Sequence, residues 1–184
     1  MSTYCDFAAN NPVHQHYHDH EYGFPVDDEN VLLERLALEI FQAGLSWDIV
    51  LKKRQGTFEA FDGFDVDTVA AYQQKDTQRL LGNPAIIRNK LKVAAIIDNA
   101  NTIIAMREEG GLAGWLKANH PLNRYDWTKL FKKTFRFTGG EIVNEFLMSV
   151  GYLPGCHDPT CAVYKQIKKL NPPWDQVDPS IYTL

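Results

Sequence analysis

Apolar residues recur at helical spacing along most of this chain, and a capping residue or a glycine marks the ends of the runs. One such stripe consists of Val31, Leu32, Leu36, Ile40 and Phe41. Asp27 or Asp28 can cap a helix before this stripe, and Gly44 can end it. No convincing run of four or more residues alternates apolar and polar residues, and the nearest, residues 134–137, is short. The pattern predicts an all-α fold.

The same signals divide the chain into a series of helices. Their predicted starts are Asn11-Pro12, Asp27 or Asp28, Ser46, Asp65, Asp76, Leu91, Thr138 and Asp158-Pro159, with two short helices within residues 111–133. Thr138 and Glu141 have the spacing of a capping box for the helix that follows them. We also expect a brief helical turn at residues 86–87.

The size and charge of the chain fit a single domain over residues 1–184. Its residues are 45% hydrophobic, and its net charge is −4. A chain of this length buries roughly 70% of the surface of its unfolded form, so it can fold without disulfides or a partner. The apolar stretches are far shorter than the ~20 residues of a membrane span, and the first residues do not form a signal peptide. We expect a cytoplasmic monomer with no membrane partner.

The three cysteines favour metal ligands or free thiols over a disulfide framework. His157 and Cys161 are separated by three residues at the predicted start of the last helix, within reach of one tetrahedral ion. Cys5 and one N-terminal histidine could complete a Cys₂His₂ zinc site that joins the two ends of the domain. The candidate histidines are His14, His16, His18 and His20. Spacing alone does not select among them, and it leaves open a Cys156–Cys161 disulfide or ordinary buried cysteines.

The N-terminal third of the chain combines aromatic residues with one acidic residue on an apolar stripe. The aromatic residues are Tyr4, Phe7, Tyr17, Tyr22 and Trp47. Glu39 lies within the apolar run 36–41, where a buried carboxylate must be paired or used. Most aromatic stripes are simply core, but aromatic faces around a single acceptor are typical of a nucleobase pocket.

Positive charge is absent from residues 1–34 and gathers in three later clusters. They are Lys52-Lys53-Arg54; Arg88, Lys90 and Lys92; and Lys129, Lys132, Lys133 and Arg136. Three clusters in a net-acidic chain favour a phosphate-binding surface. Each cluster taken alone could equally be a solvated helix face.

Several motifs follow one another in the order found in a known family. The N-terminal motifs are Cys5, Tyr17-His18-Asp19, Glu21, Gly23, and Glu39 with Gln42-Ala43-Gly44-Leu45-Ser46-Trp47, leading into Leu51-Lys52-Lys53-Arg54. The later motifs are residues 86–90, 96–100 and 135–139, and the pair His157 and Cys161. With these motifs the chain resembles the 3-methyladenine DNA glycosylase I family of base-excision repair enzymes from Cys5 to Cys161.

The resemblance implies a helix-hairpin-helix glycosylase fold and a set of site residues. The hairpin, at about residues 82–91, would grip the DNA backbone together with Lys52, Arg88 and Lys90. One structural zinc ion per chain would be bound by Cys5, His18, His157 and Cys161. Glu39 would be the catalytic residue, Leu45 the residue that plugs the duplex, and the base pocket would contain Phe7, Tyr17, Tyr22 and Trp47.

The sequence departs from the family pattern at two kinds of position. Phe7 and Tyr22 stand where the family usually has tryptophan. Glu141 and Glu145 stand where it typically has small or neutral polar residues. We interpret Glu141 as a helix-capping residue and Glu145 as part of a solvated helix face, and the chain as a divergent branch.

The resemblance implies hydrolysis of the N-glycosidic bond of an alkylated base such as 3-methyladenine in double-stranded DNA, releasing the free base. A methylated purine is cationic and leaves readily, so the protein need only extrude the nucleotide, hold the base and accept hydrogen bonds from it. No lysine nucleophile is implied, so we expect no lyase activity. Two rival hypotheses are a zinc-stabilised helical module that binds nucleic acid without turnover, and a zinc hydrolase. Four protein ligands disfavour the hydrolase, because catalytic zinc normally keeps an open position.

Overall fold

The computed structural model describes residues 3–183, and every regular element in that range is a helix. The α-helices are α1 (Tyr4–Ala9), α2 (Pro12–His20), α3 (Glu29–Gln42), α4 (Trp47–Ala60), α5 (Val66–Ala70), α6 (Gln74–Gly82), α7 (Lys90–Ala105), α8 (Gly111–Asn119), α9 (Arg124–Thr134), α10 (Gly140–Ser149) and α11 (Ala162–Lys169). Four short 3₁₀ helices are η1 (Asp62–Phe64), η2 (Arg107–Glu109), η3 (Pro173–Asp175) and η4 (Pro179–Tyr182). The predicted all-α fold is confirmed for the described residues.

Four helices begin at capping residues that the sequence predicts. The caps of α2, α3, α4 and α5 are Asn11, Asp28, Ser46 and Asp65. Each side chain accepts a hydrogen bond from a backbone N–H of the first turn, which would otherwise lack a partner.

The predicted capping box at Thr138 and Glu141 is wrong. Helix α10 is capped by Gly139 without a side-chain hydrogen bond. The acidic residue of a capping box stands three positions after the cap, so Glu141, two positions after Gly139, is one position too early. The Thr138 hydroxyl instead donates to the Phe135 carbonyl, 3.1 Å away, and Glu141 forms an ion pair with Arg124.

Three further local expectations differ from the structure. Helix α1 was not predicted, although Thr3 and Asp6 form a capping box at its start. Residues 86–87 are not helical. The last helix begins after Cys161 rather than at Asp158, whose carboxylate instead accepts hydrogen bonds from the backbone N–H and the hydroxyl of Thr160.

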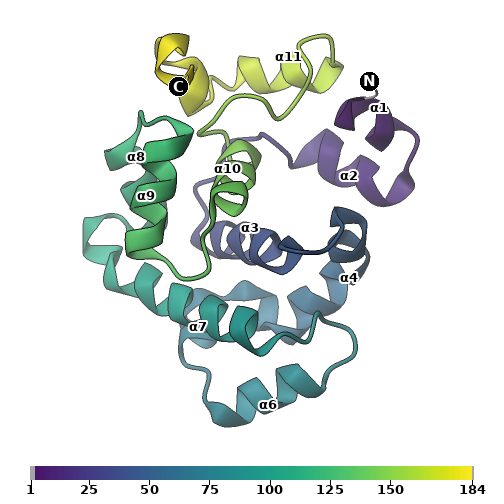
Figure 1. Ribbon diagram of the computed structural model, residues 1–184, viewed down its shortest axis with the longest axis vertical. Helices are drawn as coiled ribbons and strands as arrows, with labels where there is room; N and C mark the ends of the chain where they lie inside the picture. The colour runs from purple at the N-terminus through teal and green to yellow at the C-terminus, as the bar shows by residue number, and fades with distance from the viewer. Residues whose placement is uncertain (1–2, 184) are drawn as a thin grey trace.

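Helix α3 is central in the fold and packs against α4, α7, α8 and α10 (Figure 1). Residues 32–41 are buried, so the helix has no solvated face over this stretch. Glu34 and Arg35 are among these buried residues, and both form ion pairs. Glu39 is the third buried ionisable residue, and it faces a cavity.

Helices α6 and α7 are joined by the loop 83–89, at the position of the predicted hairpin (Figure 1). Helix α4 approaches this loop closely at Gly56, where an added Cβ would lie 2.8 Å from the Ala85 Cβ. Lys53 Nζ donates to the Pro84 carbonyl over 2.8 Å. The loop is therefore held against α4, while Arg88 and Lys90 stay exposed.

Both ends of the chain lie at the same end of the molecule, and there α1 lies near the segment that leads into α11 (Figure 1). The Asp158 backbone N–H donates to Cys5 Sγ over 3.5 Å, which joins these segments directly. No helix among residues 3–183 is long and apolar enough to cross a membrane.

Candidate functional site

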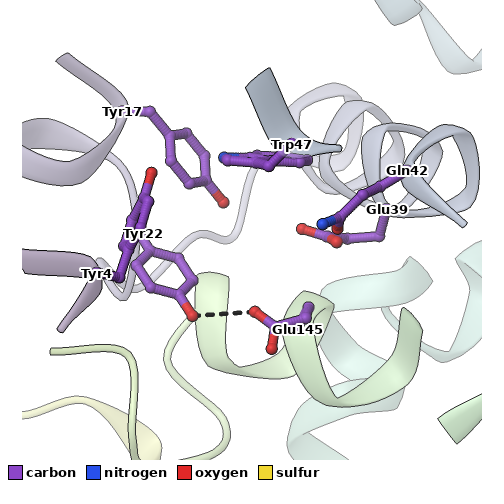
Figure 2. A pocket seen from close by; sticks show the side chains of 7 residues that line it. All are labelled: Tyr4, Tyr17, Tyr22, Glu39, Gln42, Trp47 and Glu145. Carbon is purple, nitrogen blue, oxygen red and sulfur yellow. Dashed lines mark hydrogen bonds between the residues drawn. The ribbon is translucent and has the colours of Figure 1, made fainter. Parts of the chain in front are cut away.

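An aromatic pocket opens between α1, α2, α3, α4 and α10 (Figure 2). It has a volume of about 290 Å³. Its lining residues are Tyr4, Tyr17, Tyr22, Glu39, Gln42, Trp47 and Glu145. The structure thus brings together Tyr17, Tyr22, Glu39 and Trp47, as the sequence predicted.

Aromatic rings form the walls of the pocket. The ring centroids of Tyr17 and Trp47 lie 5.1 Å apart in an edge arrangement, and those of Tyr17 and Tyr22 lie 5.5 Å apart and stacked. The Tyr17 side chain is buried, yet its hydroxyl has no hydrogen-bond partner within residues 3–183. In Figure 2 this hydroxyl points toward the open space of the pocket. A flat ligand with a polar edge would satisfy it.

Glu39 is a buried carboxylate, only 4% exposed. No group in the described part of the chain donates a hydrogen bond to it. Burial raises the pKa of Glu39 well above its ordinary value, the nearby Glu145 charge raises it further, and Arg35 opposes both. A buried acid of this kind either stays protonated or meets a positively charged ligand.

Glu145 also lines the pocket, so the interpretation of this residue as part of a solvated face is wrong. It is half-buried, and the Tyr22 hydroxyl donates to its Oε2 over 3.0 Å. Burial raises the pKa of Glu145, and the hydrogen bond from Tyr22 opposes this effect. Glu145 stands three residues after the buried Ile142 and just before the buried Phe146, so helical spacing could have indicated that Glu145 is partly buried. Its contact with Tyr22, in contrast, depends on the tertiary fold.

Phe7, which the sequence placed in the base pocket, is not among the lining residues. Its side chain is 49% exposed and packs edge-on against His14, with ring centroids 4.9 Å apart. Tyr4, one helical turn earlier on α1, lines the pocket instead. Helix α1 was absent from the predicted elements, so the orientation of its aromatic residues could not be deduced.

Leu45 lies outside the pocket at the rim of an adjoining hollow. The hollow is lined by Glu39, Gln42, Ala43, Gly44, Leu45, Glu141, Ile142 and Glu145. Gly44 adopts a positive φ of 80°, which turns the chain so that Leu45 is 41% exposed. Lys92 Nζ donates to the carbonyls of Phe41 and Ala43 and fixes the base of this turn.

Cys5, His18, His157 and Cys161 form one cluster, with candidate ligand atoms all within 4.8 Å of one another. His157 Nδ1 lies 3.1 Å from His18 Nε2, 3.7 Å from Cys5 Sγ and 3.9 Å from Cys161 Sγ. The second nitrogen of each histidine faces an oxygen acceptor: His18 Nδ1 lies 2.7 Å from Asp19 Oδ1, and His157 Nε2 lies 2.7 Å from the Tyr22 carbonyl.

These second contacts test whether the cluster fits a metal. Donation from the outer nitrogens leaves the lone pairs of His18 Nε2 and His157 Nδ1 directed toward each other and toward two sulfurs. A tetrahedral ion with bonds of about 2.0–2.1 Å to nitrogen and about 2.3 Å to sulfur requires this kind of spacing between its ligands. All three cysteines are free thiols, so the cluster could hold a metal ion and the Cys156–Cys161 disulfide is absent.

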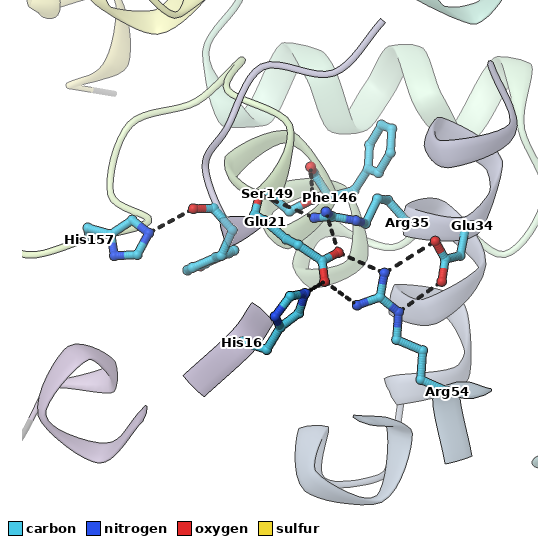
Figure 3. Close-up of polar contacts among 9 residues, drawn as sticks. His16, Glu21, Glu34, Arg35, Arg54, Phe146, Ser149 and His157 are labelled. Carbon is cyan, nitrogen blue, oxygen red and sulfur yellow. Dashed lines mark hydrogen bonds and ion pairs between the residues drawn. The ribbon is translucent and has the colours of Figure 1, made fainter. Parts of the chain in front are cut away.

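Glu21 is the centre of a buried ion-pair network beside the pocket (Figure 3). Arg35 and Arg54 both donate to its carboxylate at 2.7 Å, and Arg54 also binds Glu34 at 2.8 Å. Burial alone would raise the pKa of Glu21, but Arg54 and Arg35 lower it below its ordinary value. The Arg35 guanidinium lies 5.1 Å from the centre of the Tyr17 ring. The network therefore positions a wall of the pocket.

Arg54, which the sequence placed in a phosphate-binding cluster, is not available to bind phosphate. Its guanidinium is used internally, whereas Lys52 remains exposed next to it and pairs with Asp48 over 2.7 Å. Lys52, Arg88 and Lys90 are accessible, but no contact within residues 3–183 joins them into one surface.

A family model and several known proteins match most of this chain. A family model described as methyladenine glycosylase matches residues 7–164. DNA-3-methyladenine glycosylase 1 of Escherichia coli strain K12 is 34% identical over 87% of this chain and 96% of its own length. DNA-3-methyladenine glycosylase of Haemophilus influenzae is 39% identical over 60% of each chain.

Solved structures show the same similarity. A crystal structure of 3-methyladenine DNA glycosylase I has a TM-score of 0.77 and 34% identity, covering 86% of this chain and 97% of its own. The enzyme from Staphylococcus aureus, solved to explain 3-methyladenine recognition, has a TM-score of 0.77 and 29% identity over 86% of this chain and 95% of its own.

Proposed function

Because the chain belongs to the methyladenine glycosylase family, we propose that it is a monofunctional DNA glycosylase that releases 3-methyladenine and similar alkylated bases from DNA. The observation that carries this proposal is the aromatic pocket. In this pocket the buried carboxyl group of Glu39 lies with the Tyr17 hydroxyl, which has no hydrogen-bond partner within residues 3–183. This chemistry suits a flat base that carries positive charge and hydrogen-bond donors.

The reaction that this pocket supports needs little activation of the leaving group. An alkylated purine in DNA is cationic, so cleavage of the bond to C1′ returns its electrons to the base and releases it as a neutral molecule. Trp47 and Tyr17 would hold the extruded base by stacking, and Glu39 would accept its hydrogen bonds as the carboxylate. Water attacks C1′ and loses its proton to solvent or to a nearby carboxylate. No lysine side chain lines the pocket, consistent with hydrolysis rather than lyase chemistry.

We infer that the metal of the four-residue cluster is zinc and that it is structural. Two thiolates and two imidazoles are a typical ligand set of structural zinc sites, and four protein ligands leave no open position for water. The ion would lock α1 and α2 to the segment before α11. It would also fix Tyr22, through the hydrogen bond from His157 to the Tyr22 carbonyl.

Binding of duplex DNA would use the hairpin loop 83–89 with Lys52, Arg88 and Lys90 as phosphate contacts. Leu45 projects from a tight turn at the rim of the hollow next to the pocket, which suits a residue that fills the space left by an extruded base. Cytoplasmic location and a monomeric state remain predictions.

The deciding experiment is release of bases from methylated duplex DNA, with the products separated by identity. We expect 3-methyladenine as a main product and abasic sites without strand cleavage. Tight binding of DNA without release of any base would instead support the nucleic-acid-binding module, which the comparisons do not favour.

A further inference from the structure

Glu145 is a second carboxylate in the aromatic pocket, and the reaction described above assigns it no role. It comes from α10, whereas Glu39 comes from α3, and the two side chains enter the pocket from different sides (Figure 2). Both residues also line the adjoining hollow beside Leu45. A base in the pocket would therefore lie within reach of two acids from separate helices.

Burial raises the pKa of Glu145 above its ordinary value, but two neighbouring groups stabilise its anionic form. The Tyr22 hydroxyl donates to Glu145 Oε2 over 3.0 Å, and the Tyr22 side chain is only 8% exposed. A phenol that donates to a carboxylate stabilises the charged state of that carboxylate. Asn144, the preceding residue, acts in the same direction.

No cation in the described part of the chain pairs directly with either acid of the pocket, although the charge of Arg124 reaches Glu145 and lowers its pKa. Within residues 3–183, no lysine, arginine or histidine forms an ion pair with Glu145 or Glu39, whereas Glu141, one helical turn before Glu145, pairs with Arg124. Arg35, the basic residue whose charge reaches Glu39, donates its hydrogen bonds to Glu21. Two acids near each other repel, and this repulsion is relieved when a cation binds between them.

Building on the proposed function, we propose that Glu145 is a specificity-determining residue that binds the cationic alkylated base jointly with Glu39. Aromatic walls select a flat ligand, and two carboxylates select a positively charged one. A neutral base would desolvate both acids without compensating for their charge. The preference for a cation over a neutral base of the same shape should therefore depend on Glu145 as well as on Glu39.

The alternative is that Glu145 only anchors the Tyr22 side chain. Glu145→Gln separates the two roles, because its amide oxygen can still accept the hydrogen bond from Tyr22 while the charge is removed. Glu141→Gln is the matched control, since it removes the same charge from the same helix at an exposed position paired with Arg124.

The test uses the full chain and two probes that differ by one methyl group and one charge. 9-Methyladenine is neutral, and 3,9-dimethyladenine is a permanent cation that resembles the alkylated base still attached to its sugar. Calorimetry gives both dissociation constants. We expect Glu145→Gln to weaken binding of the cation by about tenfold, the scale of one hydrogen bond to a charged group, while binding of the neutral probe stays within about twofold. Glu141→Gln should change either value by no more than about twofold, because Glu141 reaches Glu145 only through its charge.

An unchanged cation preference in a folded Glu145→Gln protein would overturn the proposal. Melting curves show whether the variant folds, and Glu145→Ser is a second neutral variant with less bulk if it does not. Excision from methylated DNA by the wild-type protein separates this inference from the proposed function. If the wild-type protein excises bases and both Glu145 variants keep the preference for the cationic probe, only the role of Glu145 is refuted. If the Glu145 variants lose this preference but the wild-type protein excises no base, only the proposed function is refuted.

Discussion

His157 donates from Nε2 to the carbonyl oxygen of Tyr22 over 2.7 Å, and this contact joins the four-residue cysteine–histidine cluster to the aromatic pocket. The hydroxyl of the same tyrosine binds Glu145. A ligand of the cluster therefore fixes the main chain of a residue whose side chain lines the pocket. Loss of the proposed zinc ion should destabilise the fold and, through Tyr22, alter the pocket.

Cys161→Ser is the first test of this arrangement. We expect one zinc ion per wild-type chain and its loss in the variant, because a hydroxyl is a poor zinc ligand. A site occupied at 100 to 1,000 times its dissociation constant stabilises the fold by about 3–4 kcal/mol. For a chain of this size, the melting temperature should fall by roughly 6–16 °C. Elemental analysis and melting curves check both values.

The contribution of the cluster should be to stability and not to chemistry. At a temperature where Cys161→Ser is still folded, its excision rate should stay within a few-fold of the wild-type rate. Wild-type protein purified without zinc, or an equal melting temperature in both proteins, would contradict the assignment.

Lys52→Ala and Arg88→Ala test the proposed phosphate contacts. Each lost contact should reduce the slope of log K against log salt concentration by about 0.9, because fewer counterions are released on binding. Lys169→Ala removes the same charge from an exposed position on α11, a helix that lies at the opposite end of the molecule from α6 in Figure 1, and should leave the slope unchanged. Equal slopes in all four proteins would rule out both contacts.

Leu45→Ala tests the proposed plug. The shorter side chain should slow excision from duplex DNA by roughly tenfold, about 1.4 kcal/mol, because it fills less of the vacated stack. Single-stranded methylated DNA has no such gap, so both proteins should act on it equally. Leu170→Ala, at another exposed leucine, is the control. Equal slowing on both substrates would mean that Leu45 acts on chemistry or folding instead.

The features that the sequence predicted well depend on local spacing. Asp28 and Ser46 cap their helices because each side chain needs only the backbone of its own first turn. The apolar stripe of α3 also predicted a helix there, but not that every residue from 32 to 41 is buried. The grouping of Glu39 with Tyr17 and Trp47 was first indicated by the aromatic residues around one carboxylate, and the family motifs implied the same group.

The features that the sequence missed depend on contacts between distant segments. Arg54 belongs to a basic run, yet Glu21 and Glu34 bind it inside the protein. Glu145 follows the exposed Glu141 by one helical turn, and only its contact with Tyr22, 123 residues away in sequence, reveals its place in the pocket. Neither partner could be chosen from composition or periodicity.

Glu39→Gln gives a prediction that separates ligand recognition from a structural role. The pKa of Glu39 is raised in the folded protein by burial and then by Glu145. Between the unfolded pKa of about 4.3 and the raised folded pKa, the native state binds more protons than the unfolded state, so wild-type stability falls as pH rises. The stability is fully present below about pH 4 and lost as pH passes through the folded pKa.

The neutral glutamine does not titrate, so Glu39→Gln should match the wild-type protein near pH 4 and become the more stable of the two at higher pH. The gain should exceed about 0.5 kcal/mol, the range of ordinary surface substitutions. The same variant should bind 3,9-dimethyladenine more weakly by about 1.5–3 kcal/mol while 9-methyladenine changes little. Denaturant unfolding at several pH values, with calorimetry on both probes, measures these effects on one protein. A variant that is less stable at every pH and still prefers the cation would show that Glu39 supports the fold and does not recognise the base.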